Sequence, residues 1–157
     1  MPRLMRARHV LLAFAAFFVF AAPGGATSLT GPERALLAEM NRVRAAHGLR
    51  GLRVDWKLQR AARSHSAAMI RRDFFSHAAF ARRMRASGAH GPIFGENLAW
   101  GTGSRGSVRT IVGQWLESPA HRANLLRRGF ARVGVAAPAG NLLGHHARVA
   151  TADFAGS

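Results

Sequence analysis

The chain of 157 residues contains no cysteine and only one lysine, Lys57, among its 23 basic residues. Without cysteine it can form no disulfide framework, no thiolate nucleophile and no cysteine-ligated zinc site. Acidic residues are also few, 7 in all, so the formal net charge is +16 and is carried almost wholly by arginine. This excess favours anionic surfaces such as anionic lipid, an acidic polymer or nucleic acid. The arginines are spread through every segment, which is equally typical of a compositional bias, and no specific nucleic-acid partner is expected.

The motifs of several enzyme classes are missing as well. There is no His-Glu-x-x-His pair of a zinc peptidase, and no serine stands in a recognisable nucleophile motif. The glycine-rich stretch 101–106 lacks the Lys-Ser/Thr ending of a phosphate-binding loop. No residue is therefore assigned a catalytic role.

The first 26 residues have the pattern of a secretory signal. Arg3, Arg6 and Arg8 precede an apolar run from Val10 to Ala22, and Gly24-Gly25-Ala26 offers small residues for cleavage. The apolar run is short for a membrane span, although an uncleaved anchor is the alternative. Cleavage would remove three arginines and no acidic residue, which lowers the formal net charge from +16 to +13. We expect an exported protein, periplasmic or extracellular, whose residues 27–157 form one domain.

Helix and strand signals alternate along this domain and predict an α+β fold. Thr30 and Glu33 have capping-box spacing before one amphipathic helix, and Asp55 precedes a second. Pro119 should end the helix that carries Trp115, with Ser118 capping the next turn. Strands are expected in 131–136 and 147–154, with a turn at 138–141, and residues 93–101 are expected to form a short strand or a loop. Periodicity places four side chains in the core: Met40, Leu58, Trp115 and Val133.

Three polar residues lie at the ends of these elements. His77 follows the exit of the second helix, Glu96 lies between Gly95 and Leu98, and His121 lies just beyond the corner at Pro119. A buried carboxylate needs a cation, a metal or strong donors nearby. His121 is alternatively a polar corner residue. His65 lies in an apolar helix stripe, where it is expected to be a hydrogen-bonded core histidine rather than a ligand.

Several motifs occur in a fixed order and together resemble one family. They are Asn41-x-x-Arg44, Phe75-Ser76-His77, Gly95-Glu96-Asn97-Leu98-Ala99, the stretch from Trp115 to Leu126 that contains Ser118-Pro119-Ala120-His121-Arg122, and Phe130 to Val135. The chain resembles the CAP superfamily (cysteine-rich secretory, antigen-5 and pathogenesis-related proteins), and in particular its short, bacterial, disulfide-free branch, over residues 33–155. The resemblance implies a three-layer α-β-α sandwich with a small, mainly antiparallel sheet and a central polar cleft.

The resemblance also implies a site. Its position-by-position match gives His77, Glu96 and His121 as cleft residues able to hold a divalent metal such as Zn²⁺. Glu117 is the candidate for the family's second acidic residue, and Asn97 is expected to hold a cleft residue by a hydrogen bond. The alternative is that these side chains form a purely structural polar network.

Three function classes follow from these observations. The first is an exported binding module for lipid or cell-envelope ligands. The second is a metal-dependent hydrolase of envelope peptide or glycan, since two imidazoles and a carboxylate leave an open position on zinc. The third is a cationic, envelope-associated protein that acts through charge alone. A non-enzymatic role is favoured.

Overall fold

The computed structural model describes residues 28–156, so the expected signal segment lies outside the described residues. The elements, in chain order, are α1 (Gly31–Ala46), β1 (Arg53–Val54), α2 (Trp56–Arg72), α3 (Phe80–Ser87), β2 (Phe94–Gly101), the 3-10 helix η1 (Gly103–Gly106), α4 (Val108–Glu117), α5 (Pro119–Leu125), β3 (Phe130–Ala136), β4 (Ala139–Leu142) and β5 (His145–Gly156).

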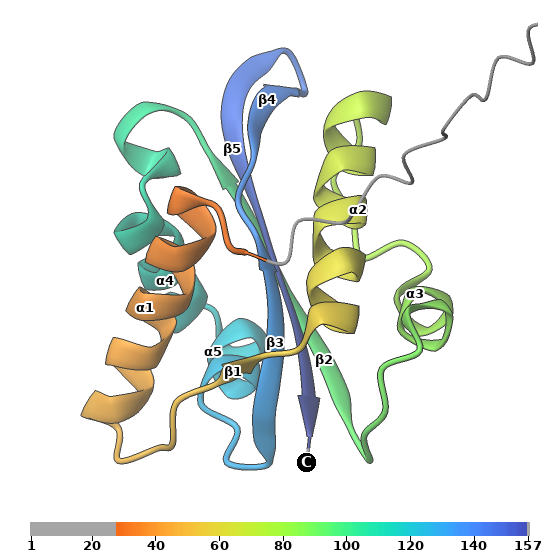
Figure 1. Cartoon of the computed structure of the whole chain (residues 1–157). Helices are drawn as coiled ribbons and strands as arrows, with labels where there is room; N and C mark the ends of the chain where they lie inside the picture. Colours follow the sequence, from red (N-terminus) through yellow and green to blue (C-terminus); the bar gives the residue numbers. More distant parts are fainter. Residues whose placement is uncertain (1–27, 157) are drawn as a thin grey trace, which may run out of the picture.

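The elements form three layers around one sheet (Figure 1). Helices α1, α4 and α5 cover one face of the sheet, and α2 with α3 covers the other. No helix among residues 28–156 is both long and apolar enough to cross a membrane. The three-layer α-β-α sandwich expected from the sequence is confirmed.

The strand order in the sheet is β1-β3-β5-β2, and β4 pairs with β5 as a short hairpin. Strands β1 and β3 pair in parallel and the other described pairs are antiparallel, which confirms a mainly antiparallel sheet. The turn expected at 138–141 was misplaced: residues 139–142 are strand β4, and the chain reverses at Leu143 and Gly144, both with positive φ. Gly144 tolerates that conformation without a steric penalty, which places the hairpin turn there.

From Val149 to Gly156, strand β5 is buried on both of its faces. Ala152 and Phe154 belong to the cluster beneath α1 and α4, whereas the intervening Thr151 and Asp153 point toward α2 and α3, where Thr151 exchanges a hydrogen bond with Ser66. Side chains alternate across a strand, so this central strand must place every second residue in each helix layer. Asp153 consequently has no exposed surface.

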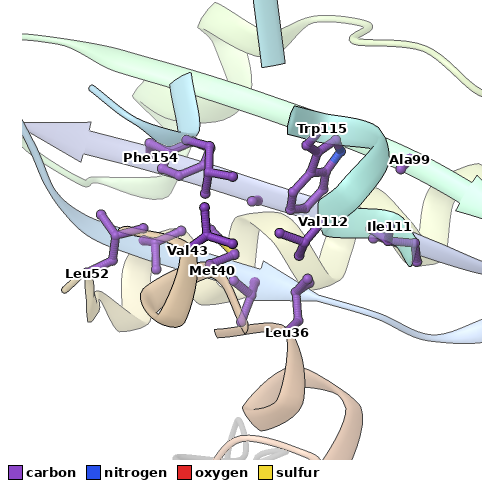
Figure 2. Close-up of a cluster of buried hydrophobic side chains, with 14 of the residues drawn as sticks. Leu36, Met40, Val43, Leu52, Ala99, Ile111, Val112, Trp115 and Phe154 are labelled. Carbon is purple, nitrogen blue, oxygen red and sulfur yellow. The ribbon is translucent and has the colours of Figure 1, made fainter. Parts of the chain in front are cut away.

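The larger hydrophobic core lies between the sheet and the α1–α4 layer (Figure 2). Trp115 and Met40 are fully buried there, and the Nε1–H of Trp115 donates to the Leu98 carbonyl at 3.0 Å. Leu58 and Val133 are also fully buried, which confirms the four core residues expected from periodicity. On the other face, a Cβ at Gly134 would lie 2.1 Å from the Leu58 backbone carbon. Glycine at this position therefore allows α2 to pack directly on β3.

Short-range signals define the helix starts. The capping box of Thr30 and Glu33 is present, and the Asp55 carboxylate accepts from the amides of Lys57 and Leu58. Ser118 separates α4 from α5 with an extended backbone, but its side chain makes no capping hydrogen bond. Pro119 alone therefore starts α5, since its missing N–H and fixed φ suit the first helical position.

One buried cation ties α1 to the segment after α5. Arg44 is 1% exposed and donates to four backbone carbonyls, at Arg50, Leu125, Arg127 and Phe130, over 2.8–3.2 Å. Burial lowers the pKa of this guanidinium. Because Leu125 is the last residue of α5, Arg44 helps to position the helix that carries His121.

Candidate histidine site

The candidate site surrounds β2, the strand at one edge of the sheet. Consecutive residues of a strand point to opposite faces, so Glu96 points toward α2 and α3 and Asn97 toward α5. Both residues are buried, Glu96 at 6% exposure and Asn97 at 0%. The edge position lets side chains from the two helix layers approach each other around this strand.

His77 lies in the segment between α2 and α3 and is joined to the buried carboxylate. Its Nδ1–H donates to Glu96 Oε1 at 2.7 Å, while its side chain remains 55% exposed. A carboxylate that accepts from one ring nitrogen sets the tautomer of the imidazole and leaves the other nitrogen available. His77 is therefore a surface imidazole held in place from behind by Glu96.

The second oxygen of Glu96 is bound by an arginine that the sequence analysis did not single out. Nη2 of Arg83, on α3, donates to Glu96 Oε2 at 2.6 Å, and its Nη1 lies 3.8 Å from Asp153 Oδ1. Of the expected partners of a buried Glu96, namely a cation, a metal or strong donors, Arg83 is the cation. Three arginines within four residues of α3 gave no sign of which one would pair with Glu96.

Asp153 is the second buried carboxyl group of this site. It pairs with Glu96 across β2 and β5, and neither of its oxygens has a hydrogen-bond partner within residues 28–156. Burial, and next the charge of Glu96, raise the pKa of Asp153 well above its usual value, while Arg83 opposes this effect. The structure thus favours a neutral Asp153.

His121, on α5, approaches the site from the opposite layer. The centroids of its ring and the His77 ring are 6.3 Å apart, with an interplanar angle of 33°. Asn97 Nδ2 donates to the His121 carbonyl at 2.9 Å, as expected of Asn97, although it binds the backbone and not the ring. Burial, and then the proximity of His77, lower the pKa of His121. The neutral imidazole is the form that binds metals.

Asn124 fixes this second half of the site and was not identified from the sequence. Its side-chain amide donates to the Glu96 carbonyl and to Asn97 Oδ1, both at 3.1 Å. It lies one helical turn after His121, so a polar residue at i+3 on a short helix was the available signal. The two amides lock α5 against the outer edge of β2, which sets the position of His121.

The remaining candidates fall into two groups. His65 is buried, its Nε2–H donates to the Ser76 carbonyl at 3.0 Å, and Glu96 Oε2 lies 3.9 Å away, which agrees with a hydrogen-bonded core histidine. Burial is the main cause that lowers its pKa. Glu117 is exposed at the end of α4 and makes no hydrogen bond or ion pair with His77, Glu96 or His121 in the described chain.

The expected metal ligands do not form a closed cluster of three. Among residues 28–156 no group of three or more His, Asp or Glu side chains is arranged to hold a metal ion. Both oxygens of Glu96 are engaged, by His77 and Arg83. The two imidazoles, however, lie next to each other, and Glu96 stands behind His77 as an orienting carboxylate does in many zinc sites. Of the three expected ligands, His77 and His121 each keep a ring nitrogen without a hydrogen-bond partner among residues 28–156, whereas both oxygens of Glu96 are engaged.

Fold and site together define an α-β-α sandwich with a paired-histidine site at the edge of its sheet. The sequence model of the Cysteine-rich secretory protein family (CAP) matches residues 37–141. The chain belongs to this family.

Individual relatives support the assignment. The chain is 28% identical over 114 residues to the uncharacterized protein YkwD of Bacillus subtilis, a match that covers 69% of this chain and 43% of that protein. The structure is similar to that of an extracellular protein of Bacillus anthracis that contains an SCP domain, with a TM-score of 0.68 and 25% sequence identity. The match covers 81% of this chain and 41% of that protein. An outer surface protein of Borrelia burgdorferi shares the fold, with a TM-score of 0.68 and 19% sequence identity. That match covers 79% of this chain and 92% of the Borrelia protein. The chain thus spans less than half the length of the two Bacillus proteins.

Proposed function

We propose that this chain is an exported CAP domain that binds a lipid or another cell-envelope component through its histidine site, defined by His77, His121 and Glu96. One observation carries the proposal. Two imidazoles lie side by side at the sheet edge, one held by a buried carboxylate that is itself paired with Arg83. A fixed polar group at the surface is what a binding site needs to orient a ligand.

Zn²⁺ is the cofactor that this donor set suits best, because imidazole nitrogen is one of its preferred ligands. His77 and His121 would hold it, and Glu96 would hold the His77 ring in the metal-binding tautomer. A bound metal would supply a positive charge and an open coordination position for an oxygen-bearing ligand.

Zinc binding is tested by titration calorimetry on the purified protein. We expect binding that weakens as the pH falls through about 6.5, the reference imidazole pKa, because protonated imidazole cannot bind a metal. His77→Ala and His121→Ala should abolish it, and His146→Ala, on the exposed β4–β5 hairpin, serves as the control. Equal zinc binding by the wild type and the His77→Ala/His121→Ala variant would refute the site.

The alternative site for a lipid ligand, in place of the histidine site, is an apolar cavity of about 470 Å³ that none of His77, Glu96 and His121 lines. It lies between the start of α1, the middle of α2 and the β3–β4 connection, where Pro32, Ala67, Ala137 and Pro138 form much of its wall. Its size falls in the range of ligand pockets. Ala67→Trp should fill it and reduce the lipid that copurifies with protein from its native host. Unchanged lipid content by mass spectrometry would exclude this cavity as the lipid site.

Export is supported by the N-terminal signal pattern and by two similar structures that are described as extracellular or outer-surface proteins. Mass spectrometry of the native protein should find a chain that starts near Thr27. A chain that retains Met1 in the cytoplasm would contradict export. Chelator-sensitive turnover of envelope peptide or glycan would instead identify the chain as a metal-dependent hydrolase.

A further inference from the structure

A second polar concavity lies between α2 and α3, and Arg83 is the only one of the functional residues inferred above that lines it. This α2–α3 groove has a volume of about 260 Å³. Its lining residues are Lys57, Arg60, Ala61 and Ser64 from α2, and Arg83, Ala86 and Ser87 from α3. Two of these lining residues, Ser64 and Ser87, are serines, and none of them is acidic.

Two cations at this groove lack a compensating charge. Arg60 is exposed and makes no hydrogen bond or ion pair within the described chain. Lys57 uses one of its three ammonium protons on the Gly88 carbonyl, at 2.9 Å, which leaves the others available. This contact holds the ammonium near the C-terminal end of α3. Arg83, in contrast, directs its guanidinium away, toward Glu96 and the Ala78 carbonyl.

The surrounding charges do not neutralise the groove. Helices α2 and α3 contain no acidic residue. The nearest one along the chain, Asp55, caps α2 and is paired with Arg132 at 2.7 Å. Lys57 and Arg60 are one helical turn apart on the same face of α2, so their charges reinforce each other in a concave, partly enclosed space.

We propose that the α2–α3 groove binds a phosphate group, carried by an anionic lipid headgroup or by a soluble phosphate-bearing compound. Lys57 would act as a point charge and Arg60 as a planar fork, the two usual modes by which proteins bind phosphate. The groove is smaller than the 300–1,000 Å³ of typical ligand pockets, which suits a single charged group. This site does not depend on zinc or on the histidine site, so either proposal can fail alone.

The test measures the binding of inorganic phosphate by NMR, through the amide signals of α2 and α3. We expect the wild type to respond, with the largest shifts next to Lys57 and Arg60. Lys57→Gln/Arg60→Gln should weaken binding at least about tenfold, because two charge-assisted hydrogen bonds are lost. The matched control, Arg105→Gln/Arg109→Gln, removes the same charge from exposed positions on η1 and α4 and should change affinity by less than about twofold.

Vesicles of phosphatidylcholine with and without phosphatidylglycerol distinguish the two sources of phosphate. Loss of phosphatidylglycerol-dependent binding in the groove variant, together with loss of phosphate binding, assigns a lipid headgroup. Loss of phosphate binding alone assigns a soluble phosphate. Absence of any phosphate response in the wild type, or equal loss in the groove and control variants, would overturn the proposal. The single variant Arg60→Gln keeps the test valid if loss of the Lys57–Gly88 contact disturbs α3.

Discussion

Replacing Arg44 with methionine keeps most of the buried stem but removes a cation that donates to four backbone carbonyls. The acceptors at Leu125 and Phe130 are completely buried, and those at Arg50 and Arg127 are partly so. In the variant, two carbonyls would therefore stay buried without a donor, and water could reach the other two.

The magnitude follows from those two carbonyls. Each unsatisfied buried group costs about 1–3 kcal/mol, which gives roughly 2–6 kcal/mol for the pair. Removing a buried cation that lacks a counter-ion offsets part of this loss. We therefore expect Arg44→Met to lower the free energy of unfolding by about 2–4 kcal/mol. Arg44→Lys should also destabilise the protein, because an ammonium cannot reproduce the planar donor geometry.

Urea denaturation at constant m-value measures this free energy, since a changed midpoint with an unchanged slope reports stability alone. Arg42→Met is the matched control. Arg42 lies two residues away on α1, has a side chain 62% exposed, and pairs only with Glu39 one turn earlier, so its loss should cost less than about 1 kcal/mol. A loss below about 1 kcal/mol for Arg44→Met would show that the carbonyls find other donors, and the reasoning would fail.

Three further predictions concern the core residue Trp115 and two buried titratable residues, His65 and Asp153. Trp115→Ala should cost about 3–5 kcal/mol in the same assay, because it leaves a cavity and an unpaired Leu98 carbonyl; a cost below about 1 kcal/mol would contradict its burial. Because burial lowers the pKa of His65, the unfolded chain takes up a proton on this residue at a higher pH than the folded chain does. Stability should therefore fall as the pH drops below about 6.5. In thermal melts at several pH values, His65→Gln should reduce this dependence of stability on pH. Asp153 gives stability the opposite dependence on pH, because its pKa is raised in the folded protein. Its contribution to stability is fully present below about pH 3.8 and is lost as the pH rises through the pKa of the folded state. Asp153→Asn should remove this loss and stabilise the protein at neutral pH, and a less stable variant there would count against a neutral Asp153.

Much of the architecture could be predicted from the sequence, because its signals are local. A capping box needs only Thr30 and Glu33, and a helix break needs only Pro119 and the residue before it. The core position of Trp115 follows from one helical period. The grouping of His77 with Glu96 and His121 in one cleft did not come from such signals; it was implied by the resemblance to the CAP superfamily.

The tertiary structure decided which side chains complete the site. Nothing near Asp153 indicates that its strand is central and covered on both faces; that depends on the order β1-β3-β5-β2 and on helices far away in sequence. Arg83 is one of three similar arginines on α3, and only the packing of that helix selects it as the partner of Glu96. Short-range interactions determine where each helix begins and ends, whereas the partners of a buried charge are determined by long-range packing. The sequence pattern therefore predicted that Glu96 needs a cation, a metal or strong donors nearby, and the fold supplies the cation Arg83.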